Sequence, residues 1–83
     1  MSEINHITDL NGDQYWRLDG QYHRLDGAAV IYTNGYQYWC QNGKIHRLDG
    51  PAVMRLDKVE EWWINGINIT KEVEIWLATN IIT

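Results

Sequence analysis

Residues 37–50 read QYWCQNGKIHRLDG, and residues 14–27 read QYWRLDGQYHRLDG. The step between these stretches is 23 residues, and residues 14–36 match residues 37–59 at 11 of 23 positions. A third, more divergent copy begins with EEWWING at residue 60. A fixed period of this kind is typical of a repeat architecture, in which each unit covers the exposed edge of the next.

Pairs of Asn or Asp followed by Gly recur with the same period. One set is Asp19-Gly20, Asn42-Gly43 and Asn65-Gly66, and a second set is Asn11-Gly12 and Asn34-Gly35. Such pairs adopt positive φ readily and build two-residue type I′ turns between antiparallel strands. The sequence therefore predicts a mainly β fold: an antiparallel β-meander of about two and a half hairpin repeats over residues 7–69.

The third repeat breaks off, because HRLDG is replaced by ITKEV at residues 69–73. Thr70 suits a helix N-cap, and acidic residues follow it in the first turn. Apolar side chains then fall at helical spacing, at Val73, Trp76, Leu77 and Ile81. We expect a short C-terminal helix over about residues 71–79 that packs on the last hairpin and caps a single domain spanning residues 1–83.

Composition limits the classes of function. Among 83 residues there is one cysteine, which excludes an intrachain disulfide and a four-cysteine zinc site. Seven Lys and Arg against eleven Asp and Glu give a net charge of −4, which disfavours binding to extended nucleic acid. No apolar run is long enough for a membrane span, and residues 1–10 lack the apolar core of a secretory signal. We expect no membrane association and a cytoplasmic location.

The aromatic residues are five Trp and five Tyr, with no Phe. Strand alternation places Trp16, Trp39 and Trp62 on one face of the sheet. Tyr15 and Tyr38 form a stripe on the opposite face, which ends in Glu61. The pattern alone does not decide which face is buried. We expect the tryptophans to form the core, with a ligand platform or a partner surface as alternatives.

The HRLDG segments are the densest in chemistry. In the structural interpretation, Arg24 and Arg47 pair with the aspartates two residues on, and His23 and His46 pack against a neighbouring Trp. The alternatives are contact with a ligand or partner, and a metal site. Zinc favours closely spaced ligands, whereas these residues come from separate repeats, so we expect no metal and no cofactor.

The string NGKIHRLDGPA at residues 42–52, preceded by Trp39, resembles a MORN-like repeat. It looks like the variant found in proteins of tailed bacteriophages and giant viruses, and the resemblance covers about residues 7–69. It departs from the standard motif at Arg47-Leu48-Asp49, and Ala28 stands where the variant usually has Pro. The resemblance implies a β-hairpin array and a role in protein or lipid contact, not catalysis.

These observations predict a small, non-enzymatic binding protein of phage type that engages and inhibits a host defence or regulatory protein in the host cytoplasm. No nucleophile and base stand together in the pattern, and Cys40 occupies a position that the repeat does not specify. The candidate binding residues are Trp16, Trp39, Trp62, Trp63, Tyr22, Tyr32, Arg24, Arg47, His23 and His46, with Trp76 as a further contact residue. One alternative is a protein that sequesters a small nucleotide by stacking. Another is a self-assembling structural protein, including a homodimer joined through a sheet edge.

Overall fold

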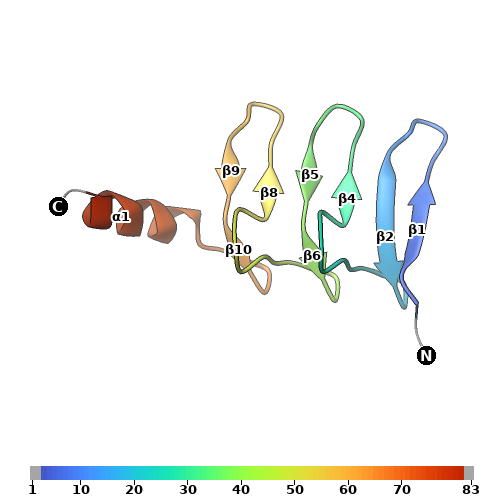
Figure 1. The fold of residues 1–83 in the computed structure, drawn as a ribbon, viewed down its shortest axis with the longest axis horizontal. Coiled ribbons are helices and arrows are strands. Elements are labelled where there is room, and N and C mark those ends of the chain that lie inside the picture. Colours follow the sequence, from blue (N-terminus) through green and yellow to red (C-terminus); the bar gives the residue numbers. More distant parts are fainter. Residues whose placement is uncertain (1–2, 82–83) are drawn as a thin grey trace.

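A computed structural model describes residues 3–81 as a row of short antiparallel strands with one helix at the C-terminal end (Figure 1). The elements are β1 (Asn5–Thr8), β2 (Gln14–Leu18), β3 (Gln21–Tyr22), β4 (Val30–Ile31), β5 (Gln37–Tyr38), β6 (Cys40–Gln41), β7 (Lys44–Ile45), β8 (Val53–Met54), β9 (Glu60–Glu61), β10 (Trp63–Ile64), β11 (Ile67–Asn68) and α1 (Thr70–Ile81). The predicted mainly β class, with an antiparallel meander and a short C-terminal helix, is confirmed.

Each repeat contains two hairpins that point in opposite directions (Figure 1). The long hairpins β1–β2, β4–β5 and β8–β9 join side by side into one sheet in the order β1-β2-β4-β5-β8-β9. The short hairpins are β2–β3, β6–β7 and β10–β11. The register repeats with the sequence period, because Tyr15 pairs with Val30 and Tyr38 pairs with Val53.

The two sets of Gly-containing pairs form different turns. In the short hairpins both turn residues have positive φ, as at Asn42 (52°) and Gly43 (78°), so these are the expected type I′ turns. In the long hairpins that contain Asn11-Gly12 and Asn34-Gly35, only the glycine has a positive φ, as at Gly35 (99°). There the Gly35 N–H donates to the Tyr32 carbonyl and the Tyr32 N–H to the Tyr36 carbonyl, which closes a three-residue loop.

The prediction of two-residue turns at Asn34-Gly35 and Asn11-Gly12 is therefore wrong. Side chains stabilise the longer loops. Asn34 Oδ1 accepts the Tyr36 N–H at 3.0 Å, and Asp9 Oδ1 accepts the N–H groups of Asn11 and Asp13. In the third long hairpin, Lys58 (φ 65°) occupies the position that glycine holds in the other two.

The sheet is one layer thick, with overall extents of 47 × 30 × 17 Å. The buried apolar residues are small: Ala28, Ala29, Val30, Cys40, Ala52 and Val53. Ala29 lies between two strands, since its N–H donates to the Tyr38 carbonyl and its own carbonyl accepts the Trp16 N–H. Trp16, Trp39 and Trp62 are only half-buried. The expectation that the tryptophans fill the core is wrong, because a one-layer sheet encloses no interior wide enough for them.

Helix α1 extends away from the sheet and does not cover the last hairpin (Figure 1). Ile75 and Trp76 remain 58% and 61% exposed, and only Val73 of the expected apolar stripe is half-buried. The Ile81 side chain, also part of that stripe, lies outside the described side chains. The packing prediction is therefore wrong. The helix begins one residue after β11, and the Ile69 N–H and Thr70 Oγ1 are both hydrogen-bonded to the Trp62 backbone, which fixes the start of the helix at the edge of the sheet. No helix in the described part of the chain is long and apolar enough to cross a membrane.

Candidate binding surface: the tyrosine face

The strand register assigns side chains to two faces of the sheet. His6 pairs with Trp16 on one face, which we call the tryptophan face and which carries Trp39 and Trp62 in the next repeats. On the opposite face, which we call the tyrosine face, each residue pairs with the next across neighbouring strands. The order is Tyr15, Val30, Tyr38, Val53 and Glu61. The two predicted stripes are both present, and the aromatic rings of both are half-buried. The tyrosine face also contains the buried Val30 and Val53.

On the tryptophan face, arginines cover two of the indole rings. The guanidinium carbon of Arg24 lies 3.9 Å from the Trp16 ring centre, and Arg47 lies 3.9 Å from Trp39. Arg47 also donates from Nε to Asp49 at 3.0 Å and from Nη1 to the Pro51 carbonyl at 3.1 Å. Arg24 makes the equivalent bonds, to Asp26 and Ala28, at the same distances. The expected ion pairs are confirmed, and these guanidinium groups are engaged within the repeat.

The glycine of each HRLDG segment makes room for its arginine. A Cβ atom at Gly27 would lie 2.7 Å from the Arg24 guanidinium carbon, and one at Gly50 would lie 2.8 Å from that of Arg47. Each guanidinium therefore packs over a glycine on one side while it contacts an indole, a carboxylate and a carbonyl. This packing unit explains why Arg, Asp and Gly recur together at a fixed spacing.

The histidines link one repeat to the next. Nδ1 of His23 accepts the Asn42 N–H, and Nδ1 of His46 accepts the Asn65 N–H, both at 3.0 Å. Each histidine thus holds the type I′ turn of the following repeat, and its remaining ring hydrogen lies on Nε2. A stacking contact with tryptophan is made instead by His6, whose ring lies parallel to Trp16 at 4.1 Å. Within residues 3–81, no group of three His, Cys, Asp or Glu side chains could hold a metal ion.

Thr70 closes the array at its C-terminal end. In the first two repeats the Trp16 and Trp39 N–H groups donate to the carbonyls of Ala29 and Ala52. In the third repeat the Trp62 N–H donates to Thr70 Oγ1 at 2.9 Å. The N-cap prediction for Thr70 is wrong, because its hydroxyl binds the sheet and the Val73 N–H donates to the Ile69 carbonyl, which places Thr70 inside the first turn.

On the tyrosine face, all five tyrosines of the chain form one closed set of ring contacts, which we call the tyrosine cluster. Tyr15 contacts Tyr22 at 6.0 Å between ring centres, and Tyr22 contacts Tyr38 at 6.4 Å. Tyr38 contacts Tyr36 at 6.1 Å, and Tyr36 contacts Tyr32 at 5.9 Å. Tyr32 returns to Tyr15 at 6.3 Å. The cluster spans the first two repeats and brings together residues from three strands, β2, β3 and β5, and from the connection between β4 and β5.

The surroundings of the cluster raise the pKa of two of its hydroxyl groups, those of Tyr15 and Tyr38. The Tyr15 hydroxyl donates to Asp9 at 3.2 Å, and partial burial together with this carboxylate raises the pKa of Tyr15 to about 12. Burial, and then the neighbouring Tyr32, raise the pKa of Tyr38. Arg17 lies 5.3 Å from the Tyr22 ring centre, within the range of a cation–π contact.

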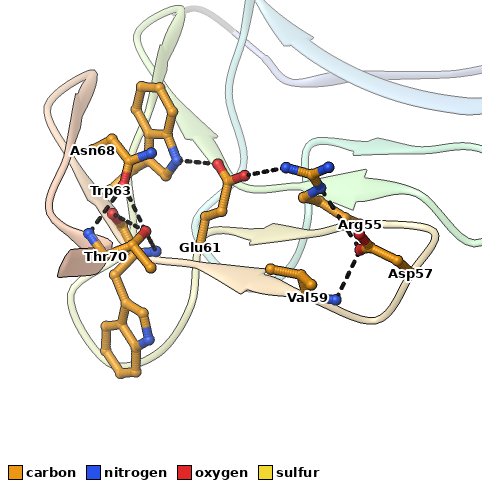
Figure 2. Close-up of polar contacts among 8 residues, drawn as sticks. Arg55, Asp57, Val59, Glu61, Trp63, Asn68 and Thr70 are labelled. Atoms are coloured by element: carbon orange, nitrogen blue, oxygen red, sulfur yellow. Dashed lines mark hydrogen bonds and ion pairs between the residues drawn. The ribbon is translucent and has the colours of Figure 1, made fainter. Parts of the chain in front are cut away.

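A polar network borders the face at its C-terminal side, where Glu61 takes the position of Tyr15 and Tyr38 (Figure 2). Glu61 accepts a hydrogen bond from Trp63 Nε1 at 2.9 Å and another from Arg55 Nη1 at 3.2 Å. Arg55 also lies 3.7 Å from Asp57. The Glu61 hydrogen bond and the Asp57 charge raise the pKa of Arg55. The network fixes the polar edge of Trp63 and leaves its ring half-buried.

An open depression of about 450 Å³ lies beside the cluster, lined by Tyr32, Asn34, Tyr36, Tyr38 and Leu56. Leu56 forms an apolar wall and is 60% exposed. The candidate residues Tyr22, Tyr32 and Trp63 lie on this tyrosine face. The depression is also lined by Tyr36 and Tyr38, which were not among the candidates predicted from the sequence, although their alternation with Gln37 already placed them on one face. Sequence reasoning missed Leu56 because a turn residue carries no periodic signal.

The remaining candidate residues do not join this surface. Trp16, Trp39, Trp62, Arg24 and Arg47 belong to the tryptophan face, and His23 and His46 lie between repeats. Trp76, the further contact residue expected from the sequence, lies on α1 and does not line the depression. Comparison of the chain with known protein families, with curated proteins and with solved structures finds no match. The proposed function is therefore based on the geometry of the two faces.

Proposed function

We propose that this chain is a non-enzymatic binding protein that recognises a protein partner through the tyrosine face. The observation that carries this proposal is the tyrosine cluster beside an open depression, on a sheet that no second layer covers within residues 3–81. Tyrosine and tryptophan are enriched at the energetic centres of protein interfaces, because each combines a large apolar area with a polar edge. Trp63 and Leu56 extend the same surface.

The state of Cys40 supports a non-enzymatic role. Its side chain is 2% exposed, and burial raises the pKa of the thiol to about 11. A buried thiol of this kind is a poor nucleophile at neutral pH. The Nδ1 atoms of His23 and His46 accept backbone N–H groups, so these histidines serve the packing of repeats.

The two alternatives have less support. A nucleotide base would need an open indole face and a free guanidinium, whereas Arg24 and Arg47 already lie on Trp16 and Trp39 and bind their own repeats. Growth of the array at its C-terminal edge by addition of further copies would need an unpaired N–H at Trp62, and Thr70 Oγ1 accepts that hydrogen. A protein partner on the tyrosine face is compatible with both observations.

The resemblance to MORN-like arrays suggests the class of partner and where the partner is located. Arrays of this variant occur in viral proteins, and on that basis we place the partner among the host's defence or regulatory proteins, in the host cytoplasm. Inhibition would then follow from steric cover of the partner's working surface. The acidic net charge of −4 favours a partner with a basic surface.

Affinity capture from a host lysate tests the proposal. Immobilised wild-type protein is compared with a Tyr22→Ser/Tyr36→Ser double variant and with Trp76→Ser, which removes an exposed aromatic side chain from α1 and serves as the matched control. We expect wild type and Trp76→Ser to retain one stoichiometric protein, and the tyrosine variant to lose it while its circular dichroism spectrum stays unchanged. Equal capture by all three proteins, or by none, would reject the tyrosine face as the binding surface.

A further inference from the structure

The tyrosine rings form a ridged surface. Ring planes meet at 85° between Tyr15 and Tyr32, at 81° between Tyr22 and Tyr38, and at 80° between Tyr36 and Tyr38. Rings that meet edge to face cannot all lie flat on the sheet. Bases and sugar rings stack on open, flat aromatic faces. A ridged aromatic surface suits a ligand that fits between the ridges instead.

An extended peptide in the polyproline II conformation has the complementary shape. It is left-handed with three residues per turn, and its carbonyl groups make no internal hydrogen bonds. Aromatic-lined grooves bind such peptides by packing against proline rings while polar edges donate to the free carbonyls. The depression is lined by three tyrosines and by Asn34, whose Oδ1 accepts the Tyr36 N–H and whose Nδ2 carries two further donors.

The charges around the cluster favour a basic residue in the ligand. Asp9 and Asp13 act on Tyr15 at one end of the cluster. At the other end, Asp57 and Glu61 hold Arg55. With Arg17 on the Tyr22 ring, these described groups comprise four carboxylates and two guanidinium groups, a local balance of −2.

From these observations we infer that the tyrosine face binds a proline-rich segment in the polyproline II conformation with an arginine or lysine beside its prolines. This inference rests on the proposed function, because it names the class of partner for the same surface. The prolines pack against Tyr32, Tyr36 and Leu56, and the basic side chain reaches one of the carboxylate pairs at the ends of the cluster.

A synthetic peptide tests the inference directly. The probe has about ten residues, with two proline pairs and a terminal arginine, and its affinity for the full chain is measured by isothermal titration calorimetry. Two matched peptides carry glycine in place of every proline, or glutamate in place of the arginine. We expect each change to weaken binding at least about ten-fold, since the first removes the pre-formed conformation and the second reverses the charge match.

Protein variants then locate the site. We expect Tyr36→Ser to weaken binding of the proline peptide at least about ten-fold, and Trp76→Ser to leave it within about two-fold, because only the first side chain lines the depression. No heat of binding at millimolar peptide, or equal affinity for the glycine peptide, would overturn the inference. Either result would leave the lysate capture unaffected, so the wider proposal of a protein partner is judged separately.

Discussion

The guanidinium carbon of Arg47 lies 3.9 Å from the centre of the Trp39 ring, and the same contact joins Arg24 to Trp16 one repeat earlier. In a sheet one layer thick, contacts of this kind replace a shared interior. Each arginine ties the corner of a repeat to the strand that precedes it, through an indole, a carboxylate and a backbone carbonyl. Stability should therefore depend on these repeated units.

Removing Arg47 tests that dependence. We expect Arg47→Ala to lower the free energy of unfolding by about 2 kcal/mol, because the indole contact contributes about 0.5–1 kcal/mol and a charged hydrogen bond about 1.5–3 kcal/mol. Urea denaturation followed by tryptophan fluorescence measures the loss. Arg55→Ala is the control, since Arg55 is 49% exposed and a surface ion pair contributes less than about 1 kcal/mol. Equal losses in the two variants would contradict the special role of Arg47.

Gly50→Ala tests the space that the arginine needs. The added Cβ would lie 2.8 Å from the Arg47 guanidinium carbon, so the guanidinium has to leave its contacts. We expect a loss of about 1–2 kcal/mol in the wild-type background and a much smaller loss in the Arg47→Ala background. A double-mutant cycle from urea denaturation gives the coupling. Additive losses would show that Gly50 serves some purpose other than making room for Arg47.

Lys58 is a site where the protein can be stabilised. Its φ of 65° lies in the left-handed region, and the equivalent positions hold Gly12 and Gly35. We expect Lys58→Gly to raise the free energy of unfolding by about 0.5–1 kcal/mol, because relief of backbone strain outweighs the entropy that glycine adds to the unfolded chain. Thermal unfolding measures the gain. The reciprocal change, Gly35→Lys, is expected to destabilise the protein, and a stabilised Gly35→Lys would refute this explanation.

Alkaline pH should weaken the fold. Burial raises the pKa of the Cys40 thiol from 9.0 to about 11, and the pKa of Tyr15 rises from 10.0 to about 12. The unfolded chain releases these protons at a lower pH than the folded chain does. The free energy of unfolding is therefore unaffected below about pH 9 and falls as the pH rises towards about 12.

Urea midpoints between about pH 8 and pH 11 measure this fall, and absorbance near 295 nm reports tyrosine ionisation. In Cys40→Ala we expect the fall to begin about one pH unit later, because tyrosines ionise in the unfolded chain only near pH 10. A midpoint that stays constant to pH 11 in the wild-type protein would contradict the burial of both groups.

The sequence predicts the repeat, the type I′ turns of the short hairpins and the two aromatic stripes, because all three follow from local spacing and strand alternation. It does not predict the three-residue loops at Asn11-Gly12 and Asn34-Gly35. It does not predict where α1 lies, since the apolar spacing of Val73, Trp76 and Leu77 carries no information about the single-residue connection at Ile69. The role of His23 and His46 is also missed. Their Nδ1 atoms bind backbone N–H groups 19 residues further along the chain, a contact that only the stacking of repeats creates.

The choice between the two faces can be measured in one sample. Nuclear magnetic resonance on protein with labelled tyrosine rings and labelled indole nitrogens follows the aromatic side chains of both faces during titration with a bound partner or with the proline peptide. We expect the signals of Tyr22, Tyr32 and Tyr36 to shift while the indole signals of Trp16 and Trp39 stay in place. Shifts confined to those indole signals, with the tyrosine signals unmoved, would show that the tryptophan face is the binding surface.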